Sequence, residues 1–433
     1  MATSNPRRTN PRNGTSSDRP TGSPGKPKKR RAVWLCLGIL LTTLTAASLI
    51  AYQTGKRDWA ASSEHEVTGP WGNLTYTDIR LEPAANRIRE AYPDLLHTVQ
   101  TNYIADDSRI WFFDTTNSNE IKDILAKAQL PAHLLQQTLD SYAPTNCGNL
   151  TKGCLKPSKE TILAIPSQTR LAFYNELAKV NENVSFQDPY RFNGTVEEWF
   201  NDNNIPAPTL EIIRRLVVPI GTCMALYDIE TVLSGSTNET VTLNILKNVA
   251  AMKTYLLKLR IDKDSDIQAI DTYWSGFNRR KDIYPILESL RNKGDTVRLD
   301  VAHLLPYLPR GRLYTYPTKP RNCHWASLNF FRDEPTPEIP TNAEIESDVT
   351  QKYQQVFDPP RFGDLLLLLA KNRSSNNLLH SAIYLADNFV YTKNGLGPNL
   401  PFVYMTIDEM KGIYDVSEPV IITRFRLKPN VQP

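Results

Sequence analysis

The sequence predicts an α+β protein with a single N-terminal transmembrane helix, a mainly helical middle domain and a C-terminal α+β domain. Three observations support this fold class: an uncharged apolar run at 32–52, helical spacing of apolar residues across 76–310, and alternating helix and strand patterns across 311–433. The chain has 433 residues, of which 40% are hydrophobic and 22% are charged, a composition sufficient for a sizeable core.

Residues 1–31 form a basic segment with almost no large apolar side chains. The segment holds nine Lys or Arg and one acidic residue, Asp18, so it carries about +8 and the rest of the chain about −4. We expect a disordered cytoplasmic tail, because this composition buries too little apolar surface to order the chain. The mildly acidic remainder has no basic footprint, so we predict no nucleic-acid partner.

Residues 32–52 contain no charged side chain and are predicted to span a membrane. At about 1.5 Å per residue such a helix covers about 30 Å, the thickness of the hydrocarbon core. Four basic residues at 28–31 precede it, and basic residues are retained on the cytoplasmic side. We therefore predict a single-pass cell-membrane protein whose bulk is extracytoplasmic. A cleaved signal peptide is the alternative. Residues 53–75 are polar and are predicted to be a linker.

Residues 76–310 are predicted to form a mainly helical extracytoplasmic domain. Apolar residues recur at helical spacing in six segments, at 121–139, 167–180, 210–218, 243–256, 267–274 and 283–290. Short strands are expected at 110–113 and 161–164. This region contains no internal repeat, no metal-spaced cluster and no glycine-rich phosphate loop, so we predict no cofactor and no metal.

The chain has five cysteines, and their contexts differ. Cys147 and Cys154 flank a turn-forming segment, and an exported compartment permits disulfides. They are a candidate pair, with two unpaired thiols as the alternative. Cys223 lies in an apolar context and is expected in the core. Cys323 is left over, and an unpaired thiol in an exported protein indicates a reactive group or an intermolecular bridge.

The C-terminal segment 311–433 alternates between helix and strand signals. A helix is expected at 323–331, and strands are expected at 363–370, 381–386, 389–392 and 420–425. The first of these strands is a continuous apolar run, which is typical of a strand buried on both faces. The next two strands are expected to pair around a two-residue turn.

Cys323 at the start of the predicted helix is a candidate nucleophile. A thiol attacks as the thiolate, and a helix N-terminus or an adjacent imidazolium lowers its pKa. The N–H groups of the same helix end are able to stabilise an oxyanion. His380, at the start of a strand, is the candidate base. Thr392 and Asn394 are two residues apart, so both are candidates to orient the imidazole ring from the paired strand.

The motifs Asn322-Cys323-His324-Trp325, Phe362-Gly363-Asp364-Leu365 and His380-Ser381-Ala382-Ile383-Tyr384-Leu385 carry a family resemblance. Their order and spacing resemble the Cys, Gly-Asp-Leu-Val and His-Val-Gly-Ile-Tyr-Leu signatures of the NlpC/P60 superfamily of papain-like cysteine peptidases and amidases. The resemblance covers residues 315–428 and implies a papain-like fold for 311–433. It also implies that Cys323 is the nucleophile and His380 the base. The third residue of the family aligns with Thr392, and we select Asn394 on chemical grounds.

The resemblance and the predicted membrane segment together suggest a function. We predict a membrane-anchored cysteine peptidase or amidase that hydrolyses amide bonds through a thioester, with peptidoglycan or another peptide as substrate. The first alternative is a catalytically inactive papain-like binding protein of the envelope. The second is a thiol-dependent acyltransferase acting on lipid. The motifs differ from the family's usual Asp-Cys-Ser-Gly at the nucleophile and lack the glycine after the histidine.

Overall fold

The computed structural model describes a mixed α/β fold in the C-terminal seven-eighths of the chain, with gaps. It describes residues 64–93, 96, 110–141, 152–187 and 189–431, except 193, 201–204, 222, 235, 237, 277–279, 372–376, 398, 415–418 and 430. Within the described residues no helix is both long and apolar enough to cross a membrane. The predicted membrane segment at 32–52 lies outside them, as do the predicted tail and Cys147.

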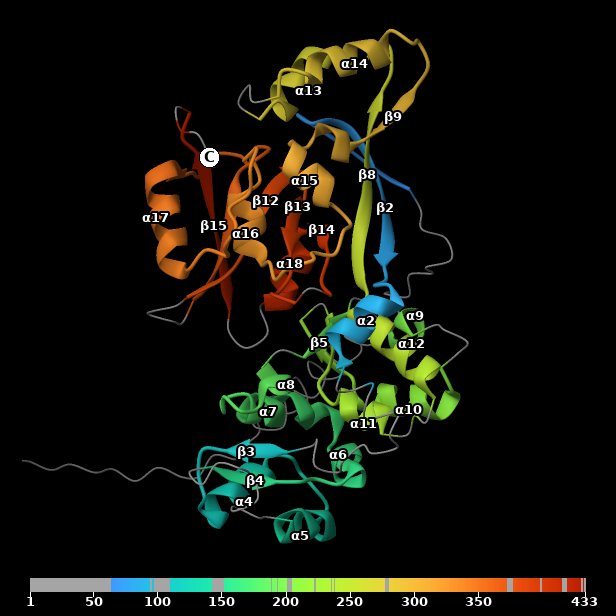
Figure 1. The fold of residues 1–433 in the computed structure, drawn as a ribbon, viewed down its shortest axis with the longest axis vertical. Coiled ribbons are helices and arrows are strands. Elements are labelled where there is room, and N and C mark those ends of the chain that lie inside the picture. The colour runs from blue at the N-terminus through green and yellow to red at the C-terminus, as the bar shows by residue number, and fades with distance from the viewer. Residues whose placement is uncertain are drawn as a thin grey trace, which may run out of the picture. The chain divides into compact units, whose positions relative to one another are not determined.

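The predicted fold class is wrong for the described chain. The longest helix among the described residues, α12 (Glu239–Ala250), has 12 residues, whereas a spanning helix needs about 20. The middle region also contains two ten-residue strands that were not predicted, so it mixes helices with a sheet. These are β2 (Gly72–Leu81) and β8 (Met252–Ile261), which Figure 1 shows side by side.

A six-stranded antiparallel sheet forms the C-terminal part of the fold. Its strand order is β10-β15-β11-β12-β13-β14. The strands are β10 (Tyr353–Gln355), β11 (Leu365–Ala370), β12 (Leu378–Ala386), β13 (Phe389–Lys393), β14 (Phe402–Thr406) and β15 (Val420–Leu427). The apolar run predicted as a doubly buried strand is β11, whose side chains are nearly all buried. The predicted strand pair is β12 and β13, joined at Asp387, which has a φ of 51°.

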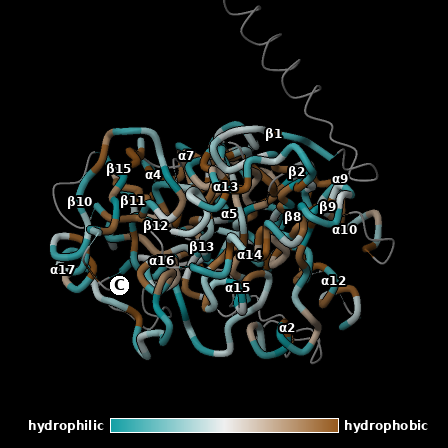
Figure 2. The backbone as a smooth tube through the Cα atoms, turned by 90° about the horizontal axis from the view of Figure 1, so that it is seen from above, coloured by the Kyte–Doolittle hydropathy of each residue, from teal (hydrophilic) through white to brown (hydrophobic). Residues whose placement is uncertain are grey.

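Helices cover both faces of this sheet. Helix α16 (Cys323–Leu328) packs against β12 and β13, and α18 (Ile407–Tyr414) packs against β14. Alternate strand residues form two separate cores. Ile383 joins the core that contains Trp325 of α16, whereas Ala382 joins the core that contains Met410 of α18. Figure 2 shows hydrophobic segments along β11 and a hydrophilic α17 (Asn342–Lys352) outside the sheet.

A second, four-stranded sheet has the order β1-β2-β8-β9 and overturns two local predictions. Strand β1 (His65–Gly69) and the beginning of β2 lie in the predicted linker at 53–75, and β8 begins inside the predicted helix at 243–256. The reason is a period of two that follows α12. Leu257, Leu259 and Ile261 are fully buried, and they alternate with basic residues. Strand β9 (Val297–Asp300) completes the sheet.

The remaining elements lie mainly between β2 and β8. The helices are α2 (Ala85–Ala91), α4 (Ser118–Ala126), α5 (Ala132–Asp140), α6 (Lys159–Ala164), α7 (Ser167–Leu177), α8 (Val184–Gln187), α9 (Val196–Trp199), α10 (Ala207–Leu216) and α11 (Ile229–Leu233). After β8 come α13 (Ile267–Trp274), α14 (Ile283–Arg291), η4 (Val301–Leu304) and α15 (Tyr307–Arg312). Two small sheets pair β3 (Trp111–Phe113) with β4 (Gly153–Leu155), and β5 (Tyr190–Phe192) with β7 (Cys223–Leu226) and β6 (Val218–Ile220).

The strand expected at 161–164 is also wrong, because these residues belong to α6. The hydroxyl of Ser158 accepts a hydrogen bond from the backbone N–H of Thr161 at 3.2 Å and caps the helix. The residues that suggested a strand form one helical turn, in which Thr161 and Ile162 are buried. Cys154 in β4 is disulfide-bonded, and Cys223 in β7 is buried as expected.

Two large hydrophobic cores divide the described chain. One core contains residues from Ile88 to Ala251. The other joins the two larger sheets, since it contains Leu74 and Leu257 together with Leu365. Polar contacts tie the same sheets together, because the Thr254 hydroxyl donates to the carbonyl of Tyr404 at 2.9 Å. The sheet that carries the predicted site is therefore stabilised by strands from the predicted middle domain.

Candidate functional site

Cys323 is the first residue of α16, as the sequence predicts. The side-chain oxygen of Asn322 accepts a hydrogen bond from the backbone N–H of Trp325 at 2.9 Å and caps the helix. All six helix residues are buried, and the Trp325 indole donates to the carbonyl of Thr336 at 2.8 Å. The cap and the buried indole fix the start of the helix, so they also fix the position of the thiol.

The thiol of Cys323 is protonated at neutral pH. Burial raises the pKa of Cys323 to about 11, and hydrogen bonds from the backbone of Ser381 and His324 act in the opposite direction without overcoming it. We expected the helix N-terminus to lower this pKa. That expectation is wrong for the resting structure, because α16 is only six residues long and the side chain is 5% exposed.

His380 is fully buried and its ring has a defined tautomer. Its Nε2 lies 2.8 Å from the Thr392 hydroxyl, which donates its own proton to the carbonyl of Ser381 at 2.9 Å. Thr392 therefore accepts from Nε2–H, and the lone pair of the ring lies on Nδ1. Nδ1 is buried and has no hydrogen-bond partner. Burial, together with the positive charges of His324 and Lys393, holds the pKa of His380 well below its usual value.

The predicted dyad is not closed by a hydrogen bond. Neither ring nitrogen of His380 bonds to Cys323, and the ring stacks on Tyr414 of α18 at a centroid distance of 4.5 Å. The residue that faces α16 is Ser381, whose hydroxyl lies 3.0 Å from Nδ1 of His324 and donates to Ser327 at 3.2 Å. Consecutive strand residues point to opposite faces, so His380 faces α18.

Thr392, rather than Asn394, holds the histidine ring. The amide of Asn394 lies 3.0 Å from the sulfur of Met405, and its carbonyl oxygen is buried without a partner. The ungapped family alignment in the sequence pointed to Thr392. The chemical preference for a carboxamide led to Asn394 instead, because strand periodicity allows either residue on that face.

Sequence reasoning did not single out Lys393, although it is a buried cation beside the thiol. Its side chain has no exposed surface, and its ammonium donates to the carbonyls of Gly395 and Gly397 at 2.9 and 3.0 Å. Burial lowers the pKa of Lys393 to about 7, and the charge of Cys323 acts in the opposite direction. A lysine beside an Asn-Gly turn resembles an exposed strand end, so no local pattern pointed to Lys393.

Gly363 and Asp364 of the Gly-Asp-Leu motif have structural roles. Gly363 has a φ of 89°, and a side chain there would collide with the ring of Phe331. The carboxylate of Asp364 is fully buried and accepts two hydrogen bonds from the Arg426 guanidinium, at 2.7 and 2.8 Å. The motif therefore anchors β11 to β15 and does not face the thiol.

Cys323 opens onto a cavity of about 640 Å³. One wall comes from the C-terminal part and the other from residues of the region before β8. The residues that line it are Tyr92, Pro189–Arg191, Val249–Met252, Asn322–His324, Leu379, Asn394–Gly397, Asn399, Leu400, Ile413 and Tyr414. The cavity thus reaches both Cys323 and Tyr414, the ring that covers His380.

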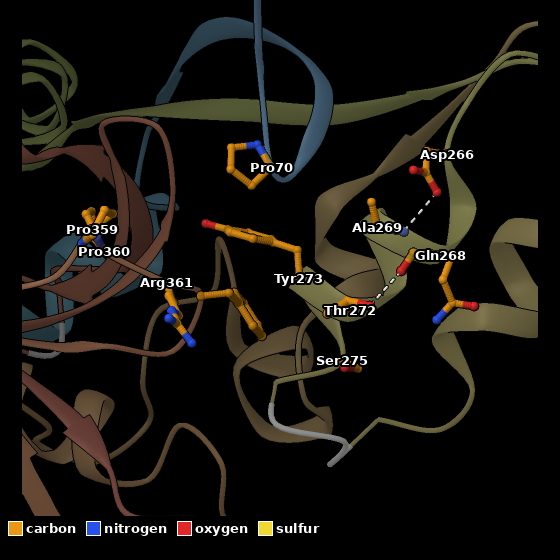
Figure 3. Close-up of a pocket in the computed structure, with 11 residues that line it drawn as sticks. Pro70, Asp266, Gln268, Ala269, Thr272, Tyr273, Ser275, Pro359, Pro360 and Arg361 are labelled. Atoms are coloured by element: carbon orange, nitrogen blue, oxygen red, sulfur yellow. Dashed lines mark hydrogen bonds between the residues drawn. The ribbon is translucent and has the colours of Figure 1, made fainter.

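A larger cavity of about 810 Å³ lies elsewhere and contains none of the predicted site residues. Figure 3 shows Tyr273 of α13 between Pro70 of the β1–β2 turn and Arg361. The phenol of Tyr273 donates to the carbonyl of Leu385 at 2.8 Å. The ring is therefore held by the fold, and we assign no chemistry to this cavity.

Comparison of the chain with family models, with curated proteins and with solved structures finds no match. The resemblance to the NlpC/P60 superfamily therefore rests on the motif residues alone.

Proposed function

We propose that this protein is a cysteine-dependent amide hydrolase whose active site is the cavity at Cys323. The observation that supports this proposal best is the tautomer of His380. A histidine held through Nε2 by Thr392 carries an unprotonated Nδ1, which is the state that a general base requires. The thiol lines the cavity, and Tyr414, the ring that stacks on His380, lines it as well.

The proposed reaction is acyl transfer through a thioester. The sulfur of Cys323 attacks the carbonyl carbon of an amide, the C–N bond breaks, and the amine leaves with a proton from the protonated base. Water then hydrolyses the thioester and regenerates the thiol. Because the resting thiol is neutral, it must lose its proton before the sulfur attacks or as it attacks, so a group that accepts this proton is required.

The proposed substrates are peptide amides, with cell-wall peptides as the first class to test. The support for this class is the motif resemblance and the predicted export of the chain. The disulfide at Cys154 agrees with export, because disulfides persist in oxidising compartments. The site needs no metal for this chemistry, since the thiol and the imidazole supply the nucleophile and the base.

The test is amide hydrolysis by the purified full-length chain. We expect peptide fragments to be released from cell-wall preparations, and Cys323→Ala to reduce the release to background. Cys223→Ala is the matched control, because Cys223 is another buried cysteine that does not line the cavity. Equal release by the wild type and Cys323→Ala would reject the proposal.

A second candidate function is ligand binding at the same cavity by a protein whose cysteine site is catalytically inactive. It is favoured by the neutral resting thiol and by the missing hydrogen bond between Cys323 and His380. In that case cell-wall peptides would bind with the same affinity to the wild type and to Cys323→Ala, and neither protein would cleave them. Calorimetry with product analysis on the same samples separates the two functions.

A further inference from the structure

Lys393 is a buried cation that the reaction described above does not use. Its ammonium has two carbonyl partners, at Gly395 and Gly397, which belong to the wall of the cavity. Among the described residues the acidic group that acts on its charge is the thiol of Cys323. A buried charge without an anion is costly, so the neutral amine is stabilised unless a neighbouring anion forms.

The fold places Lys393 and Cys323 on the same face of the sheet. Ile383 pairs with Tyr391, and continuing this antiparallel register by two residues sets Ser381 opposite Lys393. Ser381 bonds to α16, which packs on both strands. The other titratable groups around the pair are His324 on α16 and His380 on the opposite face, and burial disfavours the charged form of both.

The amine is also arranged to accept a proton. A neutral lysine that donates its two N–H groups to the carbonyls of Gly395 and Gly397 keeps one lone pair. Burial raises the pKa of Cys323 to about 11 and lowers that of Lys393 to about 7, so each group resists ionising alone. Transfer of the thiol proton ionises both groups together, and their opposite charges then offset the cost.

We propose that Lys393 is the base that ionises Cys323. The S–H bond of Cys323 breaks, an N–H bond forms at Nζ of Lys393, and the resulting ammonium stabilises the thiolate. This inference deepens the proposed function and rests on Cys323 as the nucleophile. The ammonium of Lys393 then gives this proton to the leaving amine, and the free Nδ1 of His380 accepts a proton from the attacking water and returns it to the departing thiolate.

The test is the rate at which iodoacetamide alkylates Cys323 between pH 6 and pH 9, without substrate, in the full-length chain. Lys393→Met is expected to lower the rate at pH 8 about tenfold, the effect of one pKa unit on the thiolate fraction. Lys393→Arg keeps a fixed positive charge, so it is expected to match the wild type at pH 6, where Lys393 is already charged, and to be faster than the wild type at pH 9. Lys179→Met, which removes an exposed cation, is expected to leave the rate unchanged.

An unchanged pH profile in folded Lys393→Met overturns the proposal, as does an Lys393→Arg variant as slow as Lys393→Met. If Lys393→Met does not fold, a second measurement tests the proposal without that variant. Lysine ¹³C resonances give the titration of Lys393, whose apparent pKa is expected to fall in Cys323→Ala. An identical titration in both proteins also overturns the pairing. Alkylation needs no turnover, so this result is separate from the failure or success of the hydrolase test.

Discussion

The two faces of the six-stranded sheet carry different halves of the predicted catalytic machinery. The α16 face holds Cys323, with Ser381 and Lys393 next to it, and the α18 face holds His380 and Thr392. In the sequence, positions 380 and 381 are neighbours, as are 392 and 393, but strand geometry sends each pair to opposite faces. A sequence motif therefore gives the order of the chemical groups along the chain, whereas the strand geometry decides on which face of the sheet each side chain lies.

The two faces also differ in the hydrogen-bond partners and nearby charges of their ionisable groups. On the α16 face the thiol receives hydrogen bonds and has a cation nearby. On the α18 face the imidazole has one partner and one unpaired nitrogen beneath Tyr414. An unpaired buried nitrogen costs about 1–3 kcal/mol, a penalty that a proton or substrate group reaching Nδ1 would remove. This comparison makes the α16 face the one that ionises the nucleophile and the α18 face the one that accepts a proton from the attacking water.

The largest expected effect comes from removing the base on the α18 face. His380→Ala is expected to lower kcat/KM for peptide hydrolysis by about 10³-fold, within the range for a general acid–base group. Ser381→Ala, one residue along on the α16 face, is expected to change it by less than about tenfold. Steady-state kinetics of both variants measure the difference. A larger loss in Ser381→Ala than in His380→Ala would show that His380 is not the base that activates water.

The next effect concerns the resting thiol. With a pKa of about 11 instead of the ordinary 9.0, Cys323 has about 100-fold less thiolate at pH 8 than an exposed cysteine. Its alkylation by iodoacetamide is expected to be slower by at least that factor and to rise about tenfold per pH unit from 7 to 9. The urea-unfolded chain is the control for an exposed thiol. Fast alkylation of the folded chain near pH 7 would mean that the thiolate is already formed.

The sequence predicted the C-terminal elements well because local signals determine them. The apolar run of β11, the β12–β13 pair and the helix starting at Cys323 each form close to their expected bounds. The long strands β2 and β8 were missed. Strand β2 begins inside a polar segment that was interpreted as a linker, and β8 follows α12 so closely that the helical pattern was extended into it. Their pairing joins residues such as Tyr76 and Leu257, and no local pattern reveals such a distant partner.

The candidate site could be predicted only as a set of residues. Sequence order identified Cys323 and His380, and alignment pointed to Thr392, whose hydrogen bond to the ring is present. Neither the raised pKa of the thiol nor the role of Lys393 could be predicted, because both depend on burial. Burial is set by the packing of α16 on the sheet, which is a property of the whole fold.

A smaller effect tests the buried cation on the α16 face through stability. The pKa of Lys393 falls from 10.5 in the unfolded chain to about 7 in the fold, so the unfolded chain binds more protons between these values. The wild type therefore loses stability as the pH falls from about 10.5 to about 7. Lys393→Met lacks this loss, so its stability relative to wild type is expected to be higher at pH 6 than at pH 9, by on the order of 2 kcal/mol. Urea unfolding at both pH values measures it, and an equal difference at both pH values would show that Lys393 is not desolvated.

The smallest expected effect separates the two candidates for the third residue on the α18 face. Thr392→Val removes the acceptor that fixes Nε2–H, so the proton is free to move to Nδ1 and the base is lost in part of the molecules. We expect kcat to fall about tenfold with little change in KM, because the ring remains stacked on Tyr414. Thr392→Ser keeps the hydroxyl and is expected to retain the wild-type rate.

Asn394→Ala is expected to change kcat by less than about twofold, since the amide of Asn394 contacts Met405 and not the ring. A larger loss in Asn394→Ala than in Thr392→Val would restore Asn394 as the orienting residue, and ¹⁵N resonances of His380 would show whether the tautomer had moved with it.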